Sequence, residues 1–474
     1  MQIPPGLKSR SAIIAACFAA AALVYSLTLT NGHGWRWDDG AQYIAHARNI
    51  AEGRPYAATG YIFNPQNPMT GPASYPPVYP ALLSPVYKLF GLNMIAFKLV
   101  NVLLMFLCLA LLCALAAKEE KSETAASLAL FAALPAVFWL RQLVYADWLC
   151  LALMYAAFLA FRRGGAAAGL LLGLAYSTRV AGLAGYLALA ADDIFRNRKI
   201  TARLVRMSVI FFALAAAQKI MMPAIAGSYY ISTKILLPGH DTPISGRYMS
   251  SPFNEVFIPD GMSAPFVAAL CVLLAAAATG MYIRRGRLTA ADWLAAGCPL
   301  TFIICSDGVR TLLPLLPFIP LNCIAAAKAV RDGRTRFLAG AALILCGAMA
   351  YIGSFASVWQ DYDISRPPSK QLFAAIKANT EPDAVFIARK PRMLALMTGR
   401  KASIYPQNSA PQAQLEYYRS VKAGYLLETW WLRKDREIIA PLLAARPGCF
   451  AYAYGNEMFR VYKLKLDFEQ CPKD

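Results

Sequence analysis

A succession of apolar stretches, rich in Ala and Leu, constrains this chain more than any other feature and recurs from residue 11 to about residue 359. A helix needs about 20 apolar residues to cross the roughly 30 Å hydrocarbon core of a bilayer. Charged residues make up only 16% of the 474 residues, whereas about 25% is usual in soluble domains. The pattern therefore excludes soluble, disordered, collagen-like and coiled-coil chains. It predicts a polytopic α-helical membrane protein.

We expect eleven membrane-spanning helices, each read from one apolar stretch. Their ranges are 11–30, 93–117, 124–140, 144–161, 165–178, 180–195, 204–225, 264–283, 290–305, 312–328 and 337–358. A single helix over 165–189 would move every later loop to the other side of the membrane. The distribution of charge therefore favours a break at Arg179.

The basic residues support this topology. Lys and Arg outnumber Asp and Glu by 47 to 27, giving a formal net charge of +20. If Lys8 is cytoplasmic, the clustered basic residues fall in cytoplasmic turns, and the short outside turns hold only Arg141, Arg179 and Arg310. This asymmetry obeys the positive-inside rule, which explains the net charge better than nucleic-acid binding.

Two long loops and the tail then lie on the outer side of the membrane. The loops are 31–92 and 227–262, and they belong to a transmembrane domain over residues 1–358. The tail, 359–474, alternates β-like and helical segments, which predicts a small extracytoplasmic α/β domain. The β-like runs are 384–388, 403–405, 424–427, 450–454 and 459–463, and the helical stretches are 370–379, 410–422 and 433–445. Cys449 and Cys471 of the tail either form a disulfide or remain two thiols.

Adjacent carboxylates, Asp38 and Asp39, follow the first predicted span. Such a pair can deprotonate a hydroxyl, hold a cation, or shift the pKa of its neighbour. Residues 43–51 read as an amphipathic helix that can lie along the membrane interface, and one of the two acids can simply cap it. Local spacing leaves catalysis and capping equally open.

Several absent motifs narrow the classes of function. The sequence contains no G-x-x-x-x-G-K-[ST] phosphate loop and no G-x-S-x-G elbow, and its three His residues lack zinc-site spacing. An ATP-driven motor, a zinc centre and a serine-hydrolase elbow are therefore not expected.

The order of motifs in the first loop resembles that of the GT-C membrane glycosyltransferases. Asp38-Asp39-Gly40 is followed by Ala47-Arg48-Asn49-Ile50-Ala51-Glu52-Gly53-Arg54-Pro55-Tyr56 and Tyr75-Pro76-Pro77-Val78-Tyr79-Pro80. The sequence is most similar to the bacterial branch related to protein O-mannosyltransferases and the lipid A aminoarabinose transferase. Stretches 173–182, 310–317 and 390–400 agree, so the resemblance spans nearly the whole chain.

The resemblance implies an inverting glycosyltransferase that takes a hexose or pentose from a polyprenyl phosphate. By the same resemblance, an acid of the first loop activates a lipid, glycan or protein acceptor, while the tail covers or selects that acceptor. Asp38 matches the first position of the family's acidic pair, and Asp39 stands where relatives often have Glu. Either residue can therefore be the base, and the match to the first position slightly favours Asp38.

The predicted topology favours a lipid-linked donor independently, because nucleotide sugars are made in the cytoplasm and the large loops lie outside. We expect the protein in a bacterial inner membrane.

Phosphate and acceptor ligands are sought on the outer side. Arg179, Arg310, Arg141 and Lys88 are candidates for the donor phosphate, which arginine binds through a planar fork. Alternatively, each reaches lipid headgroups or caps a helix end.

Three further residues, Asp147, Tyr75 and Tyr79, are candidates for acceptor binding. No metal ligand is assigned, because the acidic pair can either hold a divalent cation or work without one.

Two other functions compete with glycosyl transfer. A transporter or flippase for a lipid-linked glycan would carry internal repeats and broken helices at the bilayer midplane. No such repeat is visible, and the carboxylates gather at the predicted surface. An inert scaffold is also conceivable, but the intact Asp38-Asp39 pair argues against it.

Overall fold

The computed structural model describes residues 16, 18–35, 38–67, 71–116, 128, 137, 140–222, 264–305, 314–315, 318–335, 337, 340–341, 363–406 and 410–465. These residues form two compact units. The first contains the described residues of 1–29, 98–223 and 227–360, and the second those of 30–97 and 361–474. We call them the helical unit and the sheet unit.

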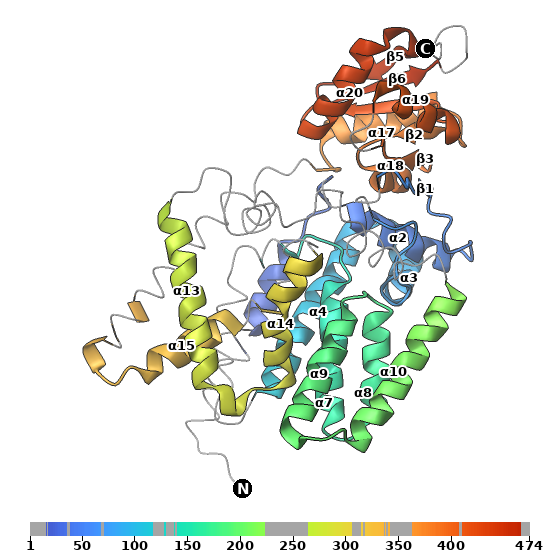
Figure 1. Cartoon of the computed structure of the whole chain (residues 1–474). Helices are drawn as coiled ribbons and strands as arrows, with labels where there is room; N and C mark the ends of the chain where they lie inside the picture. Colours follow the sequence, from blue (N-terminus) through green and yellow to red (C-terminus); the bar gives the residue numbers. More distant parts are fainter. Residues whose placement is uncertain are drawn as a thin grey trace. The chain divides into compact units, whose positions relative to one another are not determined.

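Long apolar helices build the helical unit (Figure 1). They are α4 (Met94–Leu115), α7 (Asp147–Phe161), α8 (Gly165–Tyr176), α9 (Gly182–Asn197), α10 (Ala202–Met221), α13 (Ala264–Ile283), α14 (Ala290–Cys305) and α15 (Phe318–Ala329). A short 3₁₀ turn, η3 (Arg285–Arg287), lies between α13 and α14. Helix α8 packs against α7 and α10, α9 against α14, and α13 against α15.

Small residues explain why α8 and α10 approach so closely. Gly165, Gly169 and Gly173 recur at every fourth position of α8. A Cβ atom at Gly169 would lie 2.5 Å from the Met207 carbonyl oxygen of α10. Such stripes of small residues allow helix backbones to meet, a packing mode common in membranes.

Two of the described helices, α4 and α10, are long and apolar enough to cross a membrane, and α7, α8 and Phe18–Leu27 are shorter apolar helices. The predicted break at Arg179 is confirmed, because α8 ends at Tyr176 and α9 begins at Gly182. The predicted spans 124–140 and 337–358 and the loop 227–262 lie wholly or mostly outside the described residues, so the number of spans stays a prediction.

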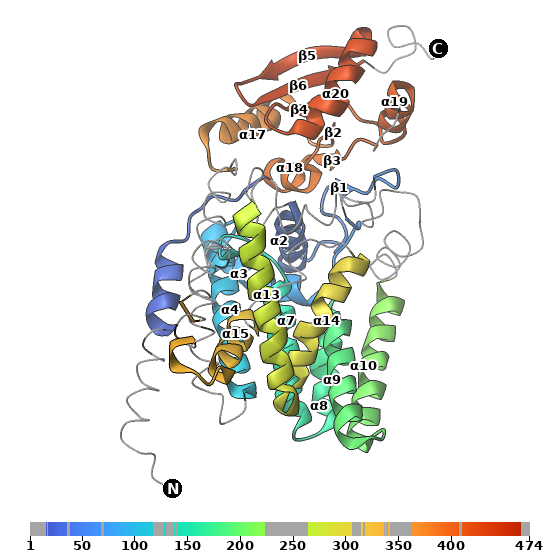
Figure 2. The same ribbon diagram turned by 60° about the vertical axis from the view of Figure 1, so that its left-hand side comes forward.

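A six-stranded sheet organises the sheet unit (Figure 2). Its strands are β1 (Tyr61–Ile62), β2 (Val385–Ile387), β3 (Lys401–Ser403), β4 (Tyr425–Thr429), β5 (Phe450–Gly455) and β6 (Phe459–Leu464), in the order β1-β3-β2-β4-β6-β5. The pairs from β1 to β4 are parallel, whereas β6 runs antiparallel to both β4 and β5.

Helices pack against this sheet. The helices among the described residues of the tail are α17 (Pro367–Asn379), α18 (Pro391–Thr398), α19 (Pro411–Ser420) and α20 (Arg433–Ala445). Leu415 of α19 and Ile439 of α20 share one core with Leu426 of β4. Every tail strand and helix predicted from sequence overlaps an observed one; β1 and α18 were not predicted.

The first loop is part of the same unit as the tail. Its α2 (Asp38–Ala51) and α3 (Val78–Phe90) pack together, and β1 pairs with β3 of the tail. Trp35 Nε1 donates to Ser369 Oγ at 2.9 Å, and the Trp35 ring packs against Phe373 and Phe459. The predicted division assigned residues 31–92 to the transmembrane domain, whereas the structure groups them with 361–474.

The state of one tail cysteine is defined. Cys449, in the short 3₁₀ turn η6 (Pro447–Cys449), is disulfide-bonded. Cys471, for which the sequence left a disulfide with Cys449 and two thiols open, lies outside the described residues.

Candidate active site

Asp38 lies at the start of α2, but its side chain accepts hydrogen bonds from the backbone of another helix, α18. Its Oδ1 atom accepts a 2.7 Å hydrogen bond from the backbone N–H of Met393, and its Oδ2 atom accepts one from the N–H of Arg392 at 3.4 Å. Both donors belong to the first turn of α18, whose N-cap residue Lys390 provides no side-chain cap. The capping role considered from sequence therefore exists, but Asp38 caps α18 of the tail.

Asp39 forms an ion pair with a buried arginine of the tail. Arg392 Nη1 donates to Asp39 Oδ1 at 2.9 Å and to Tyr75 Oη at 3.0 Å, while the Tyr75 hydroxyl donates to the same Asp39 oxygen at 2.8 Å. Arg392 is 1% exposed. Three segments of the chain thus meet at one carboxylate.

Further contacts lock the Arg392 side chain in place. Its Nη2 atom donates to the Pro72 carbonyl at 3.1 Å, and its guanidinium lies over the rings of Tyr61 and Tyr75 at 4.7 and 5.1 Å from their centroids. Gly71 has φ of +105°, and a Cβ atom there would lie 2.5 Å from Arg392 Nη2. Glycine at this position therefore makes room for the guanidinium.

The acids differ in exposure and electrostatics. Asp38 is 6% exposed, whereas the Asp39 side chain is 22% exposed. Burial raises the pKa of Asp38, although Arg392 and Lys390 act in the opposite direction. Burial also disfavours the charged form of Lys390, and therefore lowers its pKa. Asp39 is therefore the acid that a substrate reaches more easily.

Helix α2 is held by a buried histidine. His46 Nδ1 lies 2.8 Å from the Tyr56 carbonyl, and its Nε2 accepts from the Tyr75 N–H at 3.2 Å. Burial, helped by the positive charge of Arg392 and opposed by the Tyr56 contact, lowers the pKa of His46 to about 4. A neutral ring that donates through Nδ1 satisfies both contacts. The expected helix at 43–51 is confirmed, but ten of the 14 residues of α2 are buried.

The tyrosines predicted to bind the acceptor are both buried. Tyr79 is 0% exposed and packs edge-on against Tyr43, whose ring stacks on Tyr75. Tyr75 thus contacts Asp39, and Tyr79 supports it through Tyr43. Lys88, by contrast, is exposed in the last turn of α3.

In the helical unit, two predicted ligands pair with each other. Arg179 Nη1, after α8, donates to Asp147 Oδ1 at the start of α7. Both side chains are largely buried, and Asp147 Oδ2 has no hydrogen-bond partner among the described residues. Such an orphan carboxylate oxygen is costly unless a ligand uses it.

The remaining predicted cations have separate surroundings. Arg141 donates to the hydroxyl and the carbonyl of Thr28 at 3.2 and 3.1 Å. Arg310 lies outside the described residues. Sequence reasoning overlooked Lys98 of α4, which is 0% exposed and donates to Gln142 Oε1 at 2.8 Å. A lysine within an otherwise apolar run was the available signal.

Within the sheet unit, both acids already have partners. The Arg392 guanidinium already neutralises Asp39, and backbone N–H groups engage both oxygens of Asp38. Among the described residues, no group of three or more His, Cys, Asp or Glu is arranged to hold a metal ion.

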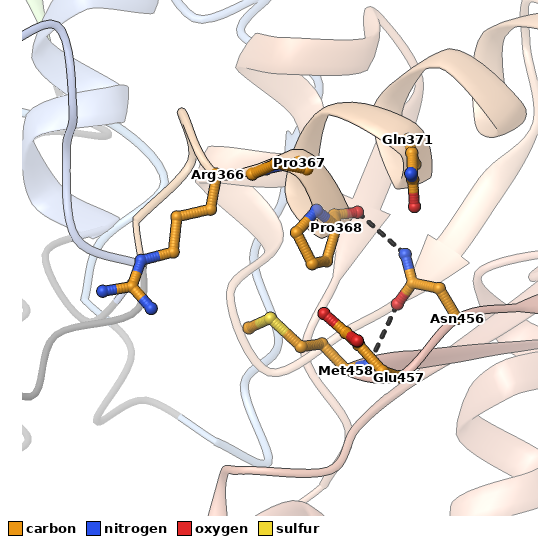
Figure 3. Close-up of a pocket in the computed structure, with 7 residues that line it drawn as sticks. All are labelled: Arg366, Pro367, Pro368, Gln371, Asn456, Glu457 and Met458. Atoms are coloured by element: carbon orange, nitrogen blue, oxygen red, sulfur yellow. Dashed lines mark hydrogen bonds between the residues drawn. The ribbon is translucent and has the colours of Figure 1, made fainter.

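A surface hollow of about 480 Å³ lies elsewhere in the sheet unit, between the start of α17 and the β5–β6 turn (Figure 3). Asn456 bridges the two elements, donating to the Pro368 carbonyl at 2.9 Å and accepting from the Met458 N–H at 3.0 Å. None of the residues predicted to be functional lines this hollow.

A protein-family model matches part of the chain. Residues 74–306 match the model of Glycosyltransferase family 87. The matched region begins after the acidic pair Asp38-Asp39. No match was found among curated proteins.

Solved structures resemble nearly the entire chain at low sequence identity. ArnT from Cupriavidus metallidurans bound to undecaprenyl phosphate matches at TM-score 0.60 and 15% identity, covering 97% of this chain and 99% of its own. The archaeal oligosaccharyltransferase AglB from Archaeoglobus fulgidus, in complex with an inhibitory peptide and a dolichol-phosphate, matches at 0.58 and 11%, covering 96% and 74%. The arabinofuranosyltransferase AftD from Mycobacteria matches at 0.53 and 12%, covering 96% and 40%.

Proposed function

The chain has the GT-C fold of membrane glycosyltransferases, and from this premise we propose that it transfers a sugar from a polyprenyl phosphate to an acceptor at the extracytoplasmic membrane face. The sugar is a hexose or pentose, and the acceptor is a lipid, glycan or protein. The observation that carries the proposal is the cluster at the start of α2, in which the partly exposed Asp39 contacts buried Tyr75 and Arg392 beside buried Asp38.

A lipid-linked donor is supported by two independent considerations. ArnT was solved with undecaprenyl phosphate and AglB with a dolichol-phosphate, and both structures resemble this chain over almost its full length. The sequence also favours an outer position for the first loop, where a cytoplasmic nucleotide sugar would not reach it.

Asp39 acts as the general base in this proposal. It is the more exposed acid, and a base must come within hydrogen-bond reach of the hydroxyl whose proton it takes. Asp38 instead holds the first turn of α18, so it positions the tail segment that carries Arg392.

The reaction then follows from the donor chemistry. Asp39 accepts the acceptor's hydroxyl proton as that oxygen forms a bond to the anomeric carbon of the sugar. The bond from this carbon to the phosphate oxygen breaks, and polyprenyl phosphate leaves with the electron pair. Attack opposite the leaving group inverts the configuration at the anomeric carbon. Arg179 is proposed to stabilise the leaving phosphate, because arginine forms strong charge-assisted hydrogen bonds to phosphate.

A transfer assay tests the proposal. The purified full-length protein is given a panel of radiolabelled polyprenyl-phosphate sugars with membrane extract as acceptor. Asp39→Asn should lower the transfer rate by about 10²- to 10⁴-fold, as expected for loss of a general base, while donor binding changes little. Asp38→Asn, the matched control, keeps an oxygen for the Met393 N–H and should lose at most about tenfold.

Three outcomes would contradict the proposal in different ways. Loss of transfer in Asp38→Asn alone would exchange the roles of the two acids. If folded protein neither transfers any of the sugars nor hydrolyses any donor, the hypothesis that it is a glycosyltransferase is wrong. Movement of a lipid-linked glycan across vesicles by that same protein would then favour a flippase.

A further inference from the structure

The helical unit contains a hollow of about 460 Å³ that neither Asp147 nor Arg179 lines. Residues that line it include Leu115, Phe161, Leu189, Arg196, Arg203 and Ala290. These residues come from the end of α4, the end of α7, the last turns of α9 and the starts of α10 and α14. Figure 1 shows the α9–α10 and α13–α14 connections at the same end of the unit.

Three arginines surround the hollow, and each retains hydrogen-bonding capacity. Arg162 donates to the Leu115 carbonyl at 2.9 Å, and Arg196 donates to Asp192 at 2.9 Å and to the Leu288 carbonyl. Arg203 lies 3.8 Å from Asp193 and over the Phe161 ring. An arginine has five N–H donors, so these contacts with described residues use only part of each guanidinium.

The two aspartates do not neutralise the arginines fully. Asp193 is 3% exposed and accepts hydrogen bonds from Asn197 at 2.9 Å and Thr201 at 2.6 Å, which tie α9 to the start of α10. Asp192 is engaged by Arg196. Three cations against two anions leave the lining with one net positive charge, at the exposed guanidinium ends.

Part of the wall of the hollow is apolar, and the surroundings are typical of a membrane interface. Leu115, Phe158, Phe161 and Leu189 face the same space as the arginines. Close by, half-exposed Phe195 stacks on Trp293 with ring centroids 5.0 Å apart. Aromatic residues of this kind gather at the headgroup level of bilayers, where basic pockets between helices bind anionic headgroups.

We propose that this hollow binds one anionic phospholipid, with its phosphate on Arg196 and Arg203 and an acyl chain along the Leu and Phe wall. Charge complementarity selects an anionic headgroup, and the adjoining apolar wall selects a lipid over a soluble phosphate. The positive-inside pattern of the sequence places this lipid in the cytoplasmic leaflet. The site is thus distinct from the proposed donor site on the other side of the membrane.

Lipid titration of the purified full-length protein tests the site. Phosphatidylglycerol, phosphatidylcholine and glycerol phosphate are each added, and bound molecules are counted by native mass spectrometry alongside the thermal unfolding temperature. Phosphatidylglycerol should be retained by the wild type and should raise its unfolding temperature, because a ligand that binds only the native state stabilises it. The Arg196→Gln/Arg203→Gln variant should bind it about tenfold more weakly.

Lys199→Gln provides the matched control, because it removes one exposed charge from the same loop without touching the hollow. It should bind phosphatidylglycerol like the wild type. If Lys199→Gln lost as much phosphatidylglycerol binding as the double variant, general surface charge would explain the effect and the proposed site would be wrong. Equal binding of phosphatidylcholine, or of glycerol phosphate, by the wild type would overturn the anionic-lipid assignment without any variant.

Discussion

Two of the ion pairs among the described residues, one in each unit, are built in opposite ways. Asp39 and Arg392 lie 353 positions apart in the sequence, whereas Asp147 and Arg179 lie only 32 positions apart, at the start of α7 and just after α8. The first pair exists only when the first loop and the tail fold together. The second follows once two consecutive helices pack. The sheet unit therefore makes its site from long-range contacts, and the helical unit from local ones.

This difference shows that the tail helps to hold the acidic pair of the first loop in place. The tail was expected to cover or select the acceptor. In the sheet unit it supplies the guanidinium beside Asp39 and the backbone donors for Asp38, while its strand β3 pairs with β1 of the first loop. The acids are thus held in a fixed geometry by residues more than 350 positions away.

The largest effect on stability is expected from Arg392→Gln. The substitution leaves two carboxylates close together without their buried cation, and breaking one side of a buried ion pair costs about 3–5 kcal/mol. Chemical denaturation of the full chain measures the change. Arg389→Gln is the matched control, because Arg389 is only half-buried and lies 5.9 Å from the Tyr405 ring centroid.

Transfer kinetics sharpen the interpretation of Arg392. Arg392→Lys keeps the charge but loses the fork that joins Asp39 to Pro72, so its rate of transfer should fall more than its stability. If Arg392→Gln is as stable and as active as the Arg389→Gln control, the long-range contact between Arg392 and Asp39 does not hold the site together.

Sequence reasoning succeeded where the controlling contacts are local. Hydropathy gave α13 as 264–283 and α14 as 290–305, the ranges observed, because every turn of such a helix is apolar. It missed β1, which has only two residues, and α18, which has eight. Neither is long enough to show a periodicity.

In the candidate site, too, the sequence predicted the features that local patterns mark and missed the contacts between distant residues. The acidic pair was found because two adjacent carboxylates and a family-like motif mark it within a few residues. Arg392 lies in the family-like stretch 390–400 of the tail, but no local pattern connects residue 392 with residue 39. Asp147 and Arg179 were each singled out by their positions at helix ends. Their mutual pairing depends on how α7 and α8 pack, which hydropathy does not specify.

His46 provides a pH test of the sheet unit. Its pKa is about 4 when folded and about 6.5 when unfolded, so the unfolded chain binds the proton more readily. Stability from this residue is complete above pH 6.5 and is lost as pH falls toward 4, by about 3 kcal/mol in total. Acids with raised pKa, such as Asp38, act in the opposite direction.

A variant isolates this contribution. Asn at position 46 can both donate to the Tyr56 carbonyl and accept from the Tyr75 N–H, but it does not titrate. The difference in unfolding free energy between wild type and His46→Asn should therefore change with pH between 6.5 and 4. A constant difference across this range would show that His46 is accessible enough to protonate in the folded protein.

Arg179 tests the local pair. If it binds the donor phosphate as well as Asp147, Arg179→Gln should raise the KM for the donor about 10- to 100-fold, since hydrogen bonds to charged groups contribute about 1.5–3 kcal/mol. Asp147→Asn serves as the comparison, and the double variant measures the coupling. An unchanged KM in Arg179→Gln, with reduced stability, would make the pair purely structural.

Lys88 should show the smallest effect, although the sequence suggested it for the same role as Arg179. It is exposed in the last turn of α3, where a cation interacts favourably with the helix C-terminus. Lys88→Gln should therefore change stability by less than about 0.5 kcal/mol and donor KM by less than about twofold, because exposed charges are screened by water and salt. A tenfold rise in donor KM would instead make Lys88 a phosphate ligand. It would also show that the sheet unit contributes to donor binding, so that the division between acids there and phosphate-binding arginines in the helical unit would no longer hold.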